Sequence, residues 1–488
     1  MSLIVASGSK MKIDLLFCNY VIASCILSII FDFDKSMGML YYLGLIVSCA
    51  TLMSVLIIPL KYILIPLLII LIVANDLTLG SGESDLFGAN NSSTPWQINL
   101  GSISPAFFIF IPVIVVFLRI FKLEKRKWDL SLPIYMFGVS MVISVIYEFP
   151  QQDFGRFFTD LKIPIFFCLG LGIFDSYFLR YPKSLPQITK IILALIAGRV
   201  MIDFLYLITN YGKRLSTYNF LSVDSTKGMV LVFVFLFLAK LIHGKQIISN
   251  LIFLGFSTAV LIAYQTKWLI IIGTLGAVII FLILNIKYKI KIILIVFLIS
   301  ATLVPFLTFF FPVVFELIGF RFAKIATINA GTSVEQVDFV RTASIVNSVS
   351  TLVDQNAILT GLGYGSWYSD SYLPMVNLNT SSFEEETLLT GRFYRIHDFF
   401  FMFLFKFGII GLLLFIRVYS KPLLIIFKLR SFFYKTYNLH ILFIVLIGCS
   451  PMFITSMFWT GKGLMVIALF VVISKRWALE ATKEPNGS

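Results

Sequence analysis

One histidine stands among charged residues in a way that could support catalysis. His397 is followed directly by Asp398, and Arg392 and Arg395 precede it by a few positions. An imidazole titrates at about pH 6.5, so it can take a proton from an attacking hydroxyl near neutrality. The other two histidines fall at the ends of apolar segments, where we interpret them as interfacial residues. The pattern therefore indicates His397 as a candidate general base.

Several further basic residues lie in segments that the charge pattern predicts to face away from the cytoplasm. Arginine offers a phosphate group a planar donor fork, and lysine offers a point charge. A group of such residues at the outer leaflet indicates a site for an anionic ligand. Any single one could instead pair with a nearby carboxylate such as Asp338, Asp354 or Glu384. The group comprises Arg156, Lys213, Arg214, Lys267, Arg321, Arg341, Arg392 and Arg395.

Carboxylates offer a rival site. Asp32 and Asp34 could hold a divalent metal against a pyrophosphate, although two aspartates are also common in a short turn between helices. Arg199 lies inside an apolar segment, where a charge costs about 2.5–3.5 kcal/mol and usually has a function. Its i, i+4 spacing to Asp203 makes a local ion pair the simpler interpretation. The five cysteines lack metal-ligand spacing. We predict no metal site and no cofactor.

These residues must be positioned by membrane-spanning elements. Hydrophobic residues make up 59% of the chain and charged residues 13%, whereas soluble domains average about half and about a quarter. Apolar segments recur with the length of about 20 residues that a bilayer core requires. We predict fourteen spans, near 12–31, 37–57, 60–77, 104–121, 130–148, 160–179, 188–209, 228–243, 248–265, 267–286, 291–312, 398–416, 439–458 and 463–475.

The charge pattern orients these spans. Lysine and arginine concentrate in alternate connections, such as 122–127, 180–190, 287–291 and 417–435, whereas the connection 78–103 contains neither. The positive-inside rule then predicts a multi-pass inner-membrane protein with both termini in the cytoplasm. The net charge of +14 is thereby assigned to topology and anionic lipid rather than to nucleic acid.

One predicted connection is much longer than the others. It divides the chain into eleven spans in 1–312, a large outer loop in 313–397, and three spans with a cytoplasmic tail in 398–488. Ser333 and Gln336 would form a capping box at the start of a helix in this loop, and Gly361, Gly363 and Gly365 form a flexible turn after it. The valines of that helix recur at helical spacing: Val337, Val340, Val346, Val349 and Val353.

The stretch from His397 to Gly411 resembles the signature of the bacterial O-antigen ligase and polymerase superfamily. In that signature a histidine and a small polar residue precede a Gly-x-x-Gly, which here is Gly408-Ile-Ile-Gly411. Asp398 departs from the usual Asn, Ser or Gln. Arg341 followed by the turn 361–365 is similar to the family's approach to that histidine. The segment 211–219 is similar to its basic, Asn-containing loop, and Lys267 stands where it usually has an arginine. The resemblance covers roughly 195–415.

The resemblance implies an all-helical, GT-C-like glycosyltransferase that acts at the periplasmic face of the bacterial inner membrane. The substrate would be an undecaprenyl-pyrophosphate-linked oligosaccharide, used without sugar nucleotide or metal. Membrane lipid and a chain-length regulator would be partners, and nucleic acid would not. His397 would be the acceptor base. The pyrophosphate or donor contacts would be Arg214, Lys267, Arg341, Arg321 and Arg395. The residues that place the loop would be Gly361, Gly363, Gly365, Gly408 and Gly411.

Three alternatives remain at this point. A ligase would share the signature and transfer finished glycan to lipid A-core, but fourteen spans favour a polymerase. A lipid-linked oligosaccharide flippase would have a similar size, yet it would not need the large loop and would usually show two related halves. A solute-coupled transporter would need acidic residues inside the membrane, for which Asp203 is the candidate. The sequence shows no internal repeat, which disfavours the last two.

Overall fold

The computed structural model describes a helical protein. The described ranges are 15–33, 37–74, 105–121, 131–148, 154–209, 334–375, 385–394, 396, 398–428 and 461–483, with Pro95 and isolated positions between 234 and 309. Across these residues the regular structure is helical, apart from one isolated antiparallel bridge between Tyr368 and Phe393. Of the predicted spans near 228–243, 248–265 and 291–312 the structure describes only separate positions, and the predicted spans near 267–286 and 439–458 lie outside the described ranges.

The other predicted spans coincide with helices. They are α1 (Leu15–Phe31), α2 (Met39–Ile57), η2–α3–η3 (Leu60–Tyr62, Leu64–Leu68, Ile69–Val73), α5 (Pro105–Ile120), α6–η6–α7 (Ser131–Ile134, Tyr135–Val139, Ser140–Glu148), α8 (Phe154–Arg180), α9 (Leu185–Thr209), α17 (Phe399–Lys428) and α20 (Gly461–Lys483). A short turn, η8 (Pro182–Ser184), joins α8 to α9. The helix predicted in the large loop is present as α15 (Val334–Asp354), and α16 (Glu385–Thr390) follows it.

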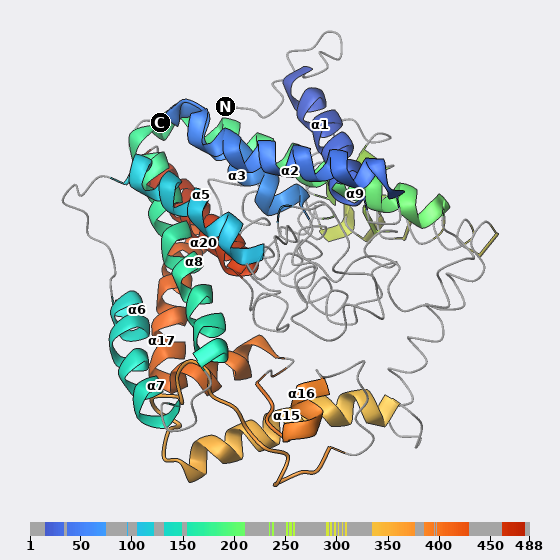
Figure 1. The fold of residues 1–488 in the computed structure, drawn as a ribbon. Coiled ribbons are helices and arrows are strands. Elements are labelled where there is room, and N and C mark those ends of the chain that lie inside the picture. Colours follow the sequence, from blue (N-terminus) through green and yellow to red (C-terminus); the bar gives the residue numbers. More distant parts are fainter. Residues whose placement is uncertain are drawn as a thin grey trace.

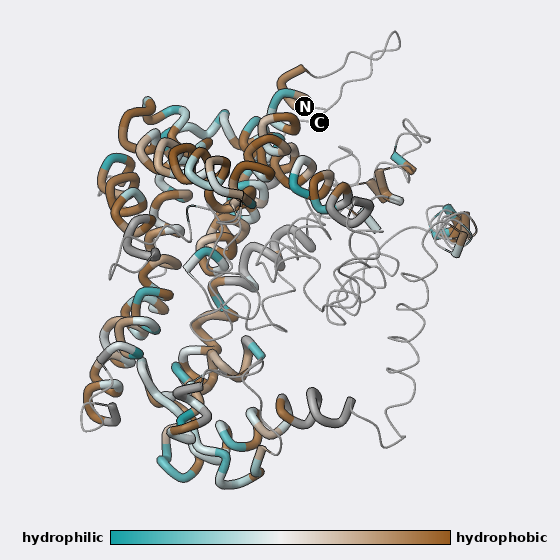
Figure 2. The backbone as a smooth tube through the Cα atoms, turned by 45° about the vertical axis from the view of Figure 1, so that its right-hand side comes forward, coloured by the Kyte–Doolittle hydropathy of each residue, from teal (hydrophilic) through white to brown (hydrophobic). Residues whose placement is uncertain are grey.

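Four of the described helices are long and apolar enough to cross a membrane, at Met39–Ile57, Gly155–Arg180, Pro182–Asp203 and Phe400–Val418. Shorter apolar helices cover Leu15–Phe31, Leu60–Val73, Ile109–Ile120 and Ser131–Ile146. The described part of the chain is therefore helical, with helices suited to a membrane, as predicted, while the fourteen spans and the GT-C-like architecture stay predictions. Figure 2 shows apolar residues along these helices and many hydrophilic positions in the loops at the lower end.

Several helices extend beyond the apolar runs that predicted them. α8 begins at Phe154 rather than near 160, α17 continues to Lys428 rather than 416, and α20 to Lys483 rather than 475. The extension of α20 contains Ala, Leu, Glu and Lys, which favour helix whether or not a bilayer surrounds them. Hydropathy thus locates the apolar part of a helix and not its ends.

α8 and α17 run parallel to each other. Near the start of both helices, Asp160 of α8 meets Lys406 of α17 at 2.6 Å. Further along both, the rings of Phe167 and Phe415 pack with centroids 6.0 Å apart. Figure 1 shows these helices together on the left of the molecule, with α15 and α16 across the lower end.

α20 also follows the direction of α8. Gly461 at its start packs against the ring of Phe166, and Arg476 near its end meets Asp175 at 2.5 Å. Between these points Gly170 allows close approach, because a Cβ there would lie 3.0 Å from Ala468 Cβ. Small residues at such crossings let helix backbones pack tightly in a membrane.

α17 is interrupted at Gly408, whose φ of 63° and ψ of −173° are not helical. The interruption leaves backbone groups without helical partners, and the chain at 358–363 satisfies them. Leu362 and Gly363 donate N–H groups to the carbonyls of Phe405 and Lys406, both at 2.9 Å. In return, the N–H groups of Ile409 and Ile410 bond to the carbonyls of residues 358 and 359, at 3.0 and 3.1 Å. The loop and the broken helix therefore complete each other.

We expect Gly408→Ala to destabilise the protein strongly. An added Cβ would overlap the Leu359 carbonyl and lie 2.5 Å from Gly361 N, in addition to the left-handed backbone strain. The matched control is Gly391→Ala, since Gly391 has a similar φ of 65° but no atom within 4 Å of the place that an added Cβ would take. That control should lose only the strain, about 1–2 kcal/mol. Melting curves of both variants in detergent measure the difference, and equal losses would contradict the proposed interlock.

Candidate functional site

Most of the residues predicted to act as the acceptor base or to contact the pyrophosphate lie outside the described ranges. These are His397, Arg214, Lys267, Arg321 and Arg395. Arg341 lies within α15, and its side chain is not among those described. The structure describes instead the predicted loop glycines, the residues that flank His397 in the sequence, and the helices that hold both.

The glycine turn sits among three helices. Gly361 packs against the backbone of α17 at Lys406 and Phe407, Gly363 against α7 at Ser144, and Gly365 against the first turn of α8. Gly363 shows why the residue type is required: its φ is +83°, and a Cβ would overlap the Ser144 hydroxyl. Three glycines separated by single residues thus let one loop approach three helix backbones.

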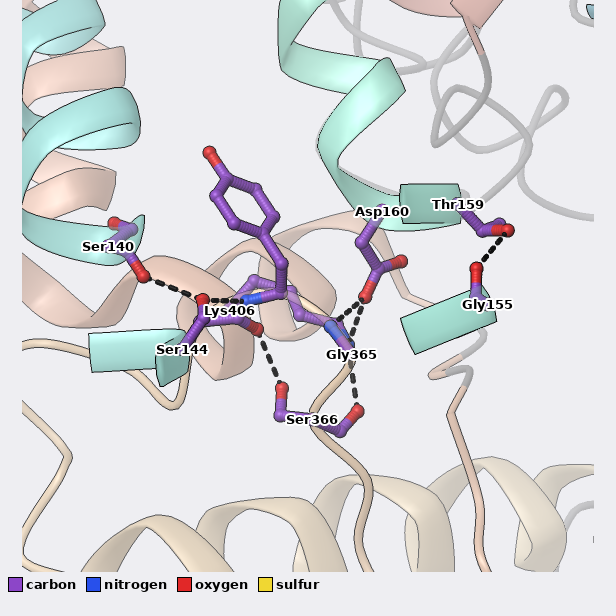
Figure 3. A network of polar contacts seen from close by, with 10 residues as sticks. Ser140, Ser144, Gly155, Thr159, Asp160, Gly365, Ser366 and Lys406 are labelled. Carbon is purple, nitrogen blue, oxygen red and sulfur yellow. Dashed lines mark hydrogen bonds and ion pairs between the residues drawn. The ribbon is translucent and has the colours of Figure 1, made fainter. Parts of the chain in front are cut away.

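A buried polar network ties this turn to the helices (Figure 3). Lys406 Nζ lies 2.6 Å from Asp160 Oδ2 and donates to the carbonyl of Ser366 at 2.8 Å. The same Asp160 oxygen accepts the N–H of Gly365 at 2.9 Å. The Lys406 side chain is 0% exposed and that of Asp160 is 12% exposed, so the attraction between the two charges is only weakly screened by solvent.

Tyr364 anchors the turn from the other side. Its N–H donates to the Ser144 hydroxyl at 2.6 Å, and its own hydroxyl donates to the Met136 carbonyl at 2.8 Å. Its ring packs edge-on against Phe157 and Phe407. A buried tyrosine hydroxyl normally finds such a partner. The turn is therefore fixed by side chains from α6–η6–α7, α8 and α17.

The chain on both sides of His397 is held in place. Upstream, Tyr368 and Phe393 exchange backbone hydrogen bonds of 3.0 and 2.9 Å, and Ile396 is buried. Downstream, Asp398 caps α17, because its Oδ1 accepts the N–H of Phe401 at 3.1 Å. A carboxylate at a helix N-terminus also interacts favourably with the helix dipole.

Two arginines of the predicted outer group lie against aromatic rings near this segment. Arg156 Cζ is 4.7 Å from the ring centroid of Tyr394, and Arg392 Cζ is 5.0 Å from that of Trp367. Cation–π contacts of this kind favour one orientation of the guanidinium. The positive charge beside the Tyr368–Phe393 bridge is therefore partly preorganised. The charge pattern predicts both arginines as outer basic residues, but no feature of the sequence indicates their aromatic partners.

Tyr368 is not a base at neutral pH. Burial raises the pKa of its hydroxyl above the ordinary value, and this effect exceeds the opposing hydrogen bond with Ser344. The hydroxyl therefore stays protonated at neutral pH. Its role is to hold the loop to α15, where Asn347 also accepts the N–H groups of Tyr372 and Leu373 at 3.1 and 2.9 Å.

The rival acidic site is occupied by an arginine. Arg199 lies 3.0 Å from Asp203, the local pair that the spacing predicts, and also 3.0 Å from Asp32. Asp34 lies outside the described ranges. No cluster of three or more metal-ligating side chains occurs in the described part of the chain. Asp32 therefore acts here as a counter-ion that joins α1 to α9.

Lys406 and Asp160 are the residues that sequence reasoning missed. Lys406 stands in the run Phe-Leu-Phe-Lys-Phe of a predicted span. A lysine there is costly and usually paired, so its position within the apolar run was the available signal. Asp160 stands at the very start of its predicted span, where a charge needs no explanation.

We expect the two charges to be strongly coupled in stability. Asp160→Leu or Lys406→Met alone leaves the other charge buried without its counter-ion, which typically costs about 3–5 kcal/mol. The double variant removes both charges and should melt above either single variant, and below the wild type only by the loss of the bonds to the Gly365 N–H and the Ser366 carbonyl. Thermal melting in detergent of all four proteins completes the cycle, and additive losses would refute the coupling.

A matched exposed cation provides the control for this cycle. Lys475 lies 3.5 Å from Asp175, but its side chain is 46% exposed. Exposed pairs contribute about 0–1 kcal/mol, so Lys475→Met should leave the melting temperature almost unchanged.

No protein-family model, no curated protein and no solved structure matches this chain.

Proposed function

We propose that this protein is an O-antigen-polymerase-like glycosyltransferase. It joins undecaprenyl-pyrophosphate-linked oligosaccharide repeat units at the periplasmic face of the inner membrane. The observation that carries the proposal is the meeting of two distant segments. The turn 361–365 and the segment that begins at His397 and continues into Gly408 interlock through backbone hydrogen bonds. These are the segments on which the resemblance rests.

Six residues would carry out the proposed glycosyl transfer, one as the base and five as contacts to the pyrophosphate. The acceptor hydroxyl attacks the anomeric carbon of the donor glycan, the bond from that carbon to the phosphate oxygen breaks, and undecaprenyl pyrophosphate leaves. His397 takes the proton of the attacking hydroxyl. Arg341, with Arg214, Lys267, Arg321 and Arg395, neutralises the charge that develops on the pyrophosphate. No metal or other cofactor enters this proposal.

The departure at Asp398 is compatible with the proposal. The residue after the family's histidine is usually Asn, Ser or Gln, and in this chain Asp398 caps α17 through its side-chain oxygen. Asparagine, serine and aspartate are comparably good capping residues. An aspartate at this position therefore caps the helix in the way an asparagine or a serine would, and α17 begins at Phe399, two residues after position 397.

The parallel course of α8, α17 and α20 supports the proposed topology. In the predicted order of spans these helices are the sixth, twelfth and fourteenth, which all cross in the same direction. Basic residues lie at one shared end of the helices, where Arg180 ends α8 and Arg476 lies near the end of α20. The turn 361–365 and α15 lie at the other end (Figure 1). The positive-inside rule assigns the basic end to the cytoplasm.

In a host from which the gene has been deleted, we expect His397→Ala to abolish the polymer ladder of the surface polysaccharide, leaving core with a single repeat unit. The matched control is His440→Ala, another of the three histidines, which we predict to be interfacial. It should restore the wild-type ladder. Gel analysis of the polysaccharide and immunoblots of membrane expression measure both.

The other outcomes of this experiment are decisive. Loss of even the single repeat unit, with long lipid-linked polymer accumulating, would mean a ligase. Accumulation of lipid-linked repeat units on the cytoplasmic side would mean a flippase. A normal ladder from well-expressed His397→Ala would refute the assignment of His397 as base.

We expect Arg341 to contribute to kcat. With purified protein and isolated undecaprenyl-pyrophosphate-linked repeat units, we expect Arg341→Ala to lower kcat about 100-fold, because one donor to the developing charge is removed. Arg341→Lys should recover only part of the rate, since lysine cannot form the bidentate contact. Equal rates of Arg341→Ala and wild type would remove Arg341 from the site.

A further inference from the structure

The Lys406–Asp160 pair is a poor device for stability alone. Its Lys406 side chain is fully buried, and apolar side chains of similar volume stabilise a buried site as well or better. What an ion pair adds over apolar packing is direction, since each hydrogen bond fixes the relative position of two atoms.

The pair joins three segments at one point. Lys406 belongs to α17, Asp160 to the second turn of α8, and both bond to the loop, Asp160 to the N–H of Gly365 and Lys406 to the carbonyl of Ser366. The Ser366 hydroxyl in turn donates to the Gly363 carbonyl at 2.8 Å. A shift of any one of the three segments breaks a bond to a buried charge.

The loop position that results is next to the segment carrying His397. Trp367 and Tyr368 directly follow Ser366 in the chain. Tyr368 forms backbone hydrogen bonds with Phe393 in the isolated bridge, and the ring of Trp367 makes the cation–π contact with Arg392. On the other side, Lys406 lies two helical turns after the Asp398 cap of α17. The pair thus sets the relative position of the two anchors that flank His397.

We propose that Lys406 and Asp160 are positioning residues for glycosyl transfer. They hold the turn 361–366 and the first turns of α17 in the relative position that the reaction requires, and neither touches the reacting atoms. The inference rests on the proposed function. A small displacement of reacting groups can cost about 100-fold in rate, so an intact fold with a relaxed loop would bind donor and turn it over slowly.

The test uses the Asp160→Leu/Lys406→Met double variant in the full-length protein in lipid nanodiscs. Two quantities are measured: steady-state kinetics on isolated undecaprenyl-pyrophosphate-linked repeat units, and hydrogen exchange of the backbone amides by mass spectrometry. We expect kcat to fall about 100-fold with an unchanged KM for the donor. We expect exchange to rise in peptides covering 358–375 and to stay as in the wild type across α8 and α20.

The matched control is a second ion pair that involves an aspartate of the same helix. Asp175 and Arg476 pair at the opposite end of α8. The Asp175→Leu/Arg476→Met variant removes an equivalent pair far from the loop and should change neither kcat nor exchange at 358–375. The Asp160→Glu variant keeps the charge pair but lengthens the acidic side chain by one methylene group. Its kcat should fall less than that of the apolar double variant.

Each result decides the proposal. If the double variant melts like the wild type and keeps its kcat, or if exchange at 358–375 is unchanged, the pair has no positioning role. If the double variant does not fold, Asp160→Glu with wild-type stability and unchanged kcat overturns the proposal, and a selective loss of kcat supports it. If the wild type itself makes no polymer, the proposed function fails, and the exchange data alone decide whether the pair holds the loop.

Discussion

Backbone groups released from a helix inside an apolar environment must find partners within the protein, and this constraint organises the structure around Gly408. An unsatisfied backbone group in a bilayer costs several kcal/mol, so irregular backbone persists there only where protein encloses it. The break in α17 meets this requirement with the loop at 358–363, and the Tyr135 hydroxyl lies 3.1 and 3.0 Å from the carbonyls of Thr360 and Phe407. Gly361 is required as a consequence, because a Cβ at this position would lie 2.5 Å from the backbone of Lys406 and Phe407.

Two buried or partly buried cations in the described part of the chain bind carbonyls at the ends of helices. Arg119 donates to the carbonyls of Val55, Leu56 and Ile58 at the end of α2, at 2.8 to 3.0 Å. Lys462 donates to the Ala74 carbonyl at 2.6 Å, just after η3. A positive charge at a helix C-terminus is favourable, and more so away from solvent. The basic balance of the chain therefore includes an internal structural share, which neither lipid nor a ligand needs to explain.

Sequence reasoning succeeded where the signal was local. The valine spacing that predicts α15 and the i, i+4 spacing of Arg199 and Asp203 both depend on residues one or two helical turns apart, and the structure contains both features. It failed where partners are far apart in the chain. The signature singles out Gly408, but nothing near it in the sequence shows that the helix breaks there or that residues 358–363 fill the break. In the same way Lys406 gives no sign that Asp160, which lies in another predicted span, is its counter-ion.

The order of the segments along the chain has a consequence for how the protein is made. Tyr135, Ser144, Asp160 and the loop at 358–363 all precede Gly408 in the sequence. A nascent chain, emerging from its N-terminus, has therefore produced every described partner of the break before the break itself leaves the ribosome. The exposed carbonyls of α17 therefore do not depend on any later segment for their described partners. Biogenesis, and not only the finished structure, thus favours a loop on the N-terminal side of the helix that it completes.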